Sequence, residues 1–275
     1  MTLTAICAKV SLPAFSVKHP EAFQVSASLP IPQPSTLAGA LTYCLGTWEK
    51  IGLKAKTKTE NLLLVARAKL LGKVTVPTPI MLRRFRVLDK GLEKGKTKGL
   101  KERPFEKACK ALSQNDFMVF RKIVEGELTD AFYREYLTTT SLNCVWIAKE
   151  PLNYEILYLL QRLGDTESLV TVTEAWSCEC REVSLENPST EYPLSLDPNI
   201  LKALEGSYMT VKMHDEKRSK LKIYYLPCSK EVSTTADGVK YFTYTPTKIE
   251  IKLEKPTKFF EVEGKIVAEA TEGND

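Results

Sequence analysis

The sequence predicts an α+β fold, in which a ferredoxin-like βαββαβ domain carries a long basic β-hairpin insertion and ends in a small antiparallel β-rich extension. Three observations predict it. A strand and a helix open the chain, the order strand–helix–strand recurs after a long glycine-spaced basic segment, and the last quarter of the chain is rich in short strand patterns. A repeated strand–helix order of this kind is typical of split βαβ folds.

The first strand and the first helix are the clearest amino-terminal elements. Residues 2–12 carry apolar side chains on both faces, which is typical of a central strand that is covered on both sides. Residues 18–34 hold four prolines and predict a loop. Ser35 then offers an N-cap, and apolar residues at helical spacing predict a helix that continues to about Lys50.

The middle of the chain gives weaker patterns. Residues 62–68 fit a helix or a strand, and residues 74–88 look extended but are interrupted by prolines. A glycine-spaced basic run follows, which cannot build a core and predicts a mobile loop or a projecting hairpin. We expect this insertion to cover about residues 83–135, and residues 111–127 within it show no defined element.

A second strand–helix–strand unit follows the insertion. Residues 138–148 are rich in β-branched and apolar residues and predict a strand. Residues 153–163 place four apolar side chains on one helical face, and Gly164 is placed to end the helix. Residues 169–176 predict the fourth strand. Together with the first half, this unit completes the βαββαβ order.

The carboxyl-terminal third predicts a linker and a small β unit. Prolines mark a linker over 186–198, and the last of four predicted strands alternates strictly between apolar and charged residues. These strands cover residues 208–213, 221–226, 239–245 and 248–254. The predicted domains are a ferredoxin-like domain over 1–185, a β-rich domain over 186–266 and an acidic, frayed tail over 267–275.

Composition excludes several classes of protein. The 275 residues are 43% hydrophobic and 27% charged, which is typical of a soluble globular chain rather than a disordered or fibrous one. Apolar runs are far too short to span a bilayer, and no secretory signal is evident. Seven unpatterned cysteines predict reduced, mostly buried thiols in a cytoplasmic protein. With two histidines in the chain, we expect no metal site and no cofactor.

The charge is distributed very unevenly along the chain. Residues 54–110 carry 17 Lys and Arg against 5 Asp and Glu, a local charge of +12. Because the whole chain carries +5, the remaining 218 residues sum to −7. A solvated surface loop is one interpretation of such a run. A basic segment on an otherwise acidic chain favours contact with a polyanion, and nucleic acid is the leading candidate.

The sharpest local motif is the segment from Leu29 to Leu41, LPIPQPSTLAGAL. Prolines hold the chain extended up to Ser35, and the helix then opens with small residues. The first amides of a helix are free donors, which makes such a start a natural phosphate site. The alternative is equally physical: Ser35 caps the helix, and Gly39 lets it pack closely on the sheet.

This motif resembles the start of the first helix in the CRISPR-associated RAMP family numbered five. Residues 130–136 (DAFYREY) and 162–168 (RLGDTES) are similar to two further segments of that family, and the resemblance covers roughly residues 1–180. The archaeal subtype I-A branch fits best. The resemblance implies a non-catalytic Cascade subunit that grips the 5′ handle of the CRISPR RNA. It also implies that the basic insertion is a thumb that contacts the backbone subunit, that the large subunit is a neighbour, and that target DNA near the PAM is met indirectly.

The resemblance also implies roles for individual residues. Ser35 and Thr36 would meet a phosphate through amides and hydroxyls. Phe85 and Tyr133 would stack on bases or simply pack, and Arg134 would contact RNA or pair with Glu135 or other neighbours. The remaining implied contacts neutralise handle phosphates. These are Arg83, Arg84, Arg86, Lys90, Lys94, Lys96, Lys98, Lys101 and Arg103.

Two alternatives remain open. One branch of the same family cleaves precursor RNA by metal-independent acid–base chemistry, which would here fall to Lys18, His19 and His214. Neither histidine occupies the mid-chain hairpin position that the cutting branch implies, so we expect no ribonuclease activity. The second alternative is an adaptor whose basic loop binds protein alone. RNA binding separates it from the scaffold subunit.

Overall fold

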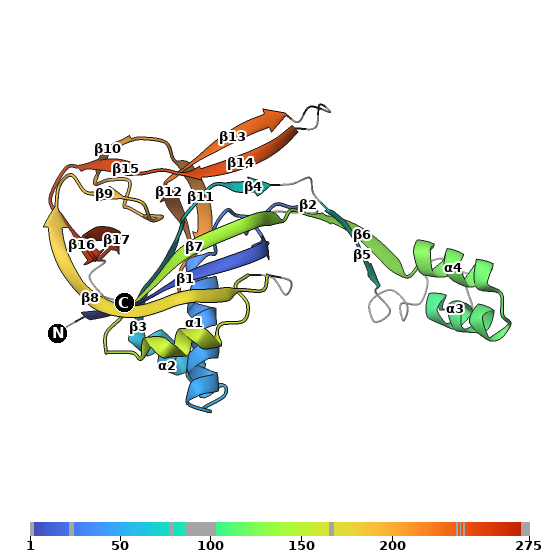
Figure 1. The fold of residues 1–275 in the computed structure, drawn as a ribbon. Coiled ribbons are helices and arrows are strands. Elements are labelled where there is room, and N and C mark those ends of the chain that lie inside the picture. The colour runs from blue at the N-terminus through green and yellow to red at the C-terminus, as the bar shows by residue number, and fades with distance from the viewer. Residues whose placement is uncertain are drawn as a thin grey trace. The chain divides into compact units, whose positions relative to one another are not determined.

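The amino-terminal strand β1 (Leu3–Phe15) lies near the centre of a large, mostly antiparallel sheet in the computed structural model (Figure 1). It pairs on one side with β7 (Leu137–Ala148) and on the other with β8 (Thr171–Leu185). Alternate residues bury opposite faces: Ile6 lies in the core cluster with the first helix, and Cys7 lies in the cluster with Phe260. The prediction of a doubly covered strand is confirmed, and the strand ends three residues later than predicted.

The structure describes residues 3–21, 25–76, 80–85, 103–164, 168–234, 236, 238 and 240–270. The chain divides into two units. Unit 1 comprises residues 1–23, 27–78 and 135–275, and unit 2 comprises residues 24–26 and 79–134. No helix among the described residues is both long and apolar enough to cross a membrane.

The fold of unit 1 is mixed α/β and is dominated by the large sheet. The strand order is β10-β15-β9-β17-β16-β8-β1-β7-β4-β14-β13, and β3 pairs with β7 beside β4. A separate two-stranded sheet is formed by β11 (Met209–His214) and β12 (Leu221–Leu226). The remaining strands are β3 (Leu63–Leu70), β4 (Val74–Val76), β9 (Ser189–Thr190), β10 (Leu201–Glu205), β13 (Cys228–Thr234), β14 (Lys240–Pro246), β15 (Ile249–Leu253), β16 (Thr257–Val262) and β17 (Lys265–Glu269).

The first helix, α1 (Pro34–Trp48), starts two residues earlier than predicted. Gln33 occupies the N-cap position without a side-chain capping bond, so the prediction that Ser35 caps the helix is wrong. Proline explains the difference, because its fixed φ suits the first helical turn and its missing N–H costs nothing there. A buried hydrogen bond fixes this helix on the sheet: Trp146 Nε1 donates to the carbonyl of Leu37 at 2.9 Å.

Two further elements of unit 1 differ from the sequence predictions. A short helix, α2 (Lys54–Leu62), precedes β3, so the ambiguous segment 62–68 is a strand. The predicted helix over 153–163 is instead a 3-10 helix, η2 (Tyr154–Leu159). Ile156 and Leu157 of this turn are still buried in the core, because a short helix is enough to cover the sheet there.

Gly164 explains why the chain turns away soon after η2. Its φ of +120° lies in the region that favours glycine. A Cβ at this position would lie 2.8 Å from the carbonyl oxygen of Ser16, closer than real side chains approach. The chain therefore passes directly against the end of β1. There the Ser168 hydroxyl accepts a hydrogen bond from Ser16 N at 3.0 Å.

The carboxyl-terminal strands continue the same sheet. β8 pairs with β16 through residues 180–185, so the segments on both sides of residue 185 lie in unit 1, and the domain boundary at 185/186 stays a prediction. The frayed tail was predicted too early, since β17 extends to Glu269 and buries Val267 and Ala268. The four strands predicted over 208–254 are confirmed to within two residues at each end.

Unit 2 contains a hairpin and two helices. β5 (Ile80–Phe85) pairs antiparallel with β6 (Thr129–Arg134), and β2 (Val25–Ser26) pairs parallel with β6. Along the chain, α3 (Pro104–Ser113) and α4 (Phe117–Gly126) follow β5 and precede β6, in a segment where no element was predicted. The Asp116 carboxylate caps α4 by accepting a hydrogen bond from Val119 N at 3.0 Å.

Candidate nucleic-acid interface

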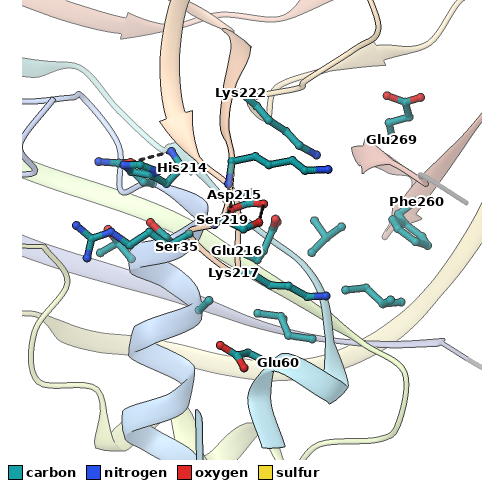
Figure 2. A pocket seen from close by; sticks show the side chains of 18 of the residues that line it. Ser35, Glu60, His214, Asp215, Glu216, Lys217, Ser219, Lys222, Phe260 and Glu269 are labelled. Carbon is teal, nitrogen blue, oxygen red and sulfur yellow. Dashed lines mark hydrogen bonds between the residues drawn. The ribbon is translucent and has the colours of Figure 1, made fainter. Parts of the chain in front are cut away.

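An open groove of about 1910 Å³ lies within unit 1 beside the start of α1 (Figure 2). Its walls come from the loop before α1, the first half of α1, the helix α2 with the start of β3, the turn between β11 and β12, and the ends of β16 and β17. Figure 2 shows Ser35 and His214 on one side of the turn and Phe260 and Glu269 on the other. Segments far apart in the sequence therefore share one surface.

The groove brings together four of the residues singled out in the sequence. Ser35 and Thr36 line it from α1, Lys18 lines it from the preceding loop, and His214 lines it from the end of β11. His19 does not line it. The imidazole Nδ1 of His19 instead accepts a hydrogen bond from Glu21 N at 3.2 Å.

The buried side chain of Gln33 joins these segments. Its amide nitrogen donates to the carbonyl of Lys18 at 3.1 Å, and its amide oxygen accepts from the main-chain N–H of His214 at 3.0 Å. One side chain thus fixes the loop, the helix start and the end of β11 against one another. Because the residue is 8% exposed, these two bonds are shielded from competing water.

The lining is predominantly cationic. Among the described residues it contains nine Lys and Arg side chains against five Asp and Glu, and such an excess favours an anionic ligand. The basic residues are Lys18, Lys56, Lys149, Lys217, Arg218, Lys220, Lys222, Lys255 and Lys258. The acidic residues are Glu60, Asp197, Asp215, Glu216 and Glu269.

Two of the acidic side chains are used inside the protein. Glu216 pairs with the buried guanidinium of Arg67 on β3 and also accepts a hydrogen bond from Ala66 N at 3.1 Å. Asp215 accepts hydrogen bonds from the main-chain N–H and the hydroxyl of Ser219, both at 2.7 Å, and from Lys220 N. Burial acts to raise the pKa of Asp215, but these hydrogen bonds hold it below its usual value.

Glu269 is the acidic group at the far end of the groove. Burial raises the pKa of this half-buried carboxyl, and the nearby Lys222 opposes that rise. The described part of the chain contains no cluster of three or more His, Cys, Asp or Glu side chains suited to a metal ion. The excess of Lys and Arg in its lining makes the groove suited to binding an anion by charge and hydrogen bonding.

The basic residues of the insertion belong to unit 2. Arg83, Arg84 and Phe85 lie on β5, and Tyr133 lies opposite Met81 on β6. Arg103 precedes α3, where its main-chain N–H donates to Glu106 at 3.2 Å. The other predicted contacts fall outside the described residues. These are Arg86, Lys90, Lys94, Lys96, Lys98 and Lys101.

The last two predicted residues of this region sit at the end of β6. Arg134 is half-buried and lies opposite Ile80. The Glu135 carboxylate accepts a hydrogen bond from Ser28 N at 3.0 Å, which is a structural role in unit 1.

Most cations of the groove were missed by the sequence analysis. Eight of the nine lie outside residues 54–110, in the part of the chain whose total charge is −7. Acidic residues elsewhere in that part outweigh these cations when charges are added along the sequence, so the sum does not reveal them. The one local signal was the run from Lys217 to Lys222, which holds four cations on a hairpin turn.

Comparison with known proteins gives a consistent family resemblance. No family model matches the chain. The chain is 26% identical over 208 residues to the CRISPR-associated protein Cas5 of Thermoproteus tenax, covering 74% of this chain and 77% of that one. It is also 26% identical over 197 residues to Cas5 of Methanocaldococcus jannaschii, covering 66% and 67%. The resemblance inferred from the sequence motifs is thereby confirmed.

A solved structure agrees in fold. A CRISPR protein from Archaeoglobus fulgidus superposes with a TM-score of 0.56 over 96% of this chain and 97% of that one, at 16% sequence identity. At this identity the likeness concerns the fold.

Proposed function

We propose that this chain is a non-catalytic, RNA-binding subunit of a type I CRISPR effector complex, in which it grips the 5′ handle of the CRISPR RNA. The similarity to proteins named Cas5 supports a place in such a complex. The archaeal subtype I-A branch is part of the proposal, as is a position at the end of the backbone filament next to the large subunit. The relation to target DNA near the PAM is indirect.

The observation that carries the proposal is the cationic groove at the start of α1. Ser35 and Thr36, the residues implied as phosphate contacts, are half-buried in a wall of this groove, and Lys18 lines the same groove. The Thr36 amide donates to the carbonyl of Gln33 at 2.9 Å, so the hydroxyls and the unpaired cations of the groove are the groups offered to a phosphate. The arrangement supports an extended RNA backbone as the ligand of this face.

The insertion supplies the second part of the proposed interface. Arg83, Arg84 and Arg86, with the lysines that follow, would neutralise handle phosphates and reach the backbone subunit as a thumb. Phe85 and Tyr133 are proposed to stack on splayed bases. The hairpin of β5 and β6 supports this reading, since it brings these segments next to each other.

The layout proposed for the core is ferredoxin-like. The neighbours β8, β1, β7 and β3 are all antiparallel, α1 connects β1 to β3, and η2 connects β7 to β8. This order and these crossovers support a βαββαβ domain with its insertion between the second and third strands.

Ribonuclease activity is the alternative, because the groove holds Lys18 and His214 on one surface. Acid–base cleavage needs a base near the 2′-hydroxyl and an acid near the leaving oxygen. The Nδ1 atom of His214 is buried and has no hydrogen-bond partner among the described residues, so it is poorly placed to relay a proton. We therefore favour the non-catalytic role.

The experiment is a binding titration of labelled RNA that carries the CRISPR repeat, followed by gel analysis of the same RNA in EDTA. We expect binding that weakens steeply as salt rises, because each neutralised phosphate releases counterions. We expect the RNA to remain intact. Absence of binding at moderate salt would overturn the proposal in favour of a protein-binding adaptor. Specific cleavage that is lost in His214→Ala would establish the ribonuclease instead.

A further inference from the structure

We propose that the turn between β11 and β12, residues 215–220, is a preorganised clamp for the phosphodiester backbone of single-stranded RNA. Lys217, Arg218 and Lys220 would make the contacts. This site lies outside the insertion and outside every residue that the sequence motifs pointed to. Its ligand rests on the proposed function, since RNA is taken as the polyanion that reaches this groove.

The turn is closed by its own hydrogen bonds. The main-chain N–H of Asp215 donates to the carbonyl of Lys220 at 3.0 Å, and that of Arg218 donates to the carbonyl of Asp215 at 3.0 Å. The Asp215 carboxylate takes three more bonds from Ser219 and Lys220. Arg218 has a φ of +57°, a conformation that a non-glycine residue holds when its surroundings fix it. The main chain that bears the cations is therefore ordered before any ligand binds.

The turn is also anchored to the body of unit 1. Glu216 pairs with Arg67 of β3, and the Arg67 guanidinium lies 5.2 Å from the ring centre of Tyr224 on β12. Arg67 is 7% exposed, so this anchor lies beneath the turn and away from solvent. Next to it, His214 N donates to the side chain of Gln33. The first end of the turn is thus fixed to the body, and Asp215 ties the other end to the first, which reduces the ordering cost that a flexible loop would incur on binding.

These contacts hold the negative charges of the turn inside the protein and leave its positive charges at the surface. The Glu216 carboxylate pairs with Arg67, and the Asp215 carboxylate accepts hydrogen bonds from Ser219 and from the main-chain N–H of Lys220. The side chains of Lys217, Arg218 and Lys220 are exposed and form no ion pair with another described residue. Figure 2 shows Lys217 and Lys222 extending from the hairpin toward the same side, one below and one above Asp215 and Ser219. Unpaired cations on an ordered main chain are well suited to phosphate.

The proposed function supplies a single strand as the ligand, and the turn lies in the path of a strand that follows the groove. The turn stands between the start of α1 and the ends of β16 and β17, so a chain passing along the groove crosses it. Contacts to phosphate fix the position of a strand without reading its bases. The clamp is therefore expected to act alike on RNAs of different sequence.

The test uses the full chain and labelled single-stranded RNA, with the affinity measured from about 0.1 to 1 M salt. In the variant Lys217→Gln/Arg218→Gln/Lys220→Gln we expect the slope of log affinity against log salt to fall by about 2, since each phosphate contact on a single strand contributes about 0.7. At about 0.1 M salt this corresponds to roughly 100-fold weaker binding. The control Lys50→Gln/Lys202→Gln/Lys248→Gln removes three exposed cations outside the groove and should change the slope by less than about 0.5.

A second variant distinguishes binding by an ordered turn from general electrostatic attraction of RNA to a positively charged surface. Asp215→Ala raises the net positive charge but removes the carboxylate that orders the turn. General attraction predicts tighter RNA binding for Asp215→Ala, whereas the clamp predicts weaker binding, and circular dichroism shows whether the variant is folded. Tighter binding would overturn the clamp.

The remaining outcomes are distinct. If the native chain binds RNA and the triple variant behaves like its control, the clamp is wrong and the proposed function stands. If the native chain binds no RNA, the proposed function fails as well. If the triple variant loses affinity for single-stranded DNA but not for RNA, the assignment of RNA to this turn is overturned.

Discussion

Replacing Glu216 by alanine is expected to lower the free energy of unfolding by about 3 kcal/mol. The side chains of Arg67 and Glu216 are 8% and 17% exposed, and the variant would leave the guanidinium buried without its counter-charge. It would also leave Ala66 N without its acceptor. Chemical unfolding of both proteins, followed by circular dichroism, measures the difference.

Matched variants identify the cause of that loss. Glu205→Ala breaks an ion pair with Lys252 in which both side chains are about half exposed, and it should change the free energy of unfolding by less than about 1 kcal/mol. The double variant Arg67→Met/Glu216→Leu should recover much of the stability, because removing both charges leaves no buried ion unpaired. A loss for Glu216→Ala no larger than that for Glu205→Ala would show that the buried pair does not hold the turn.

Replacing Arg83, Arg84 and Arg86 together by alanine is expected to lower the salt slope of RNA binding by about 2, with roughly 100-fold weaker binding at about 0.1 M salt. These arginines begin the densest basic run of the chain, and two of them lie on β5. A fluorescence titration at several salt concentrations measures the slope.

The control for this variant lies in the same unit. Arg121→Ala/Lys122→Ala removes two exposed cations from α4 and should leave the slope nearly unchanged. If the triple variant retains the native slope, the three arginines are not part of the RNA site, whatever the outcome for the groove.

Much of the sheet could be predicted from the sequence because its strands carry strong patterns. The doubly apolar pattern of β1 and the strict alternation over 249–253 each fix a strand and its buried faces. The prediction of an α-helix over 153–163 was wrong because the apolar spacing there fits a short 3-10 helix equally well. The helices α3 and α4 were missed because the charged run before them masks their periodicity.

The candidate site was partly predictable. Ser35 and Thr36 were found because a proline-rich approach and a helix start lie next to each other in the chain. The turn at 215–220 was missed for a physical reason: its two acids offset its cations in any sum along the sequence. In the folded protein, Arg67 neutralises the charge of Glu216, and the two residues lie 149 positions apart in the sequence. A sum of charges along the sequence does not include that pairing.

Sequencing the RNA that co-purifies with the chain from its own host tests the central proposal most directly. The account predicts RNAs that share one repeat-derived 5′ end and continue into different spacers, together with other subunits of the complex. Recovery of the assembled complex without nucleic acid, or with RNA that has no common 5′ end, would contradict it.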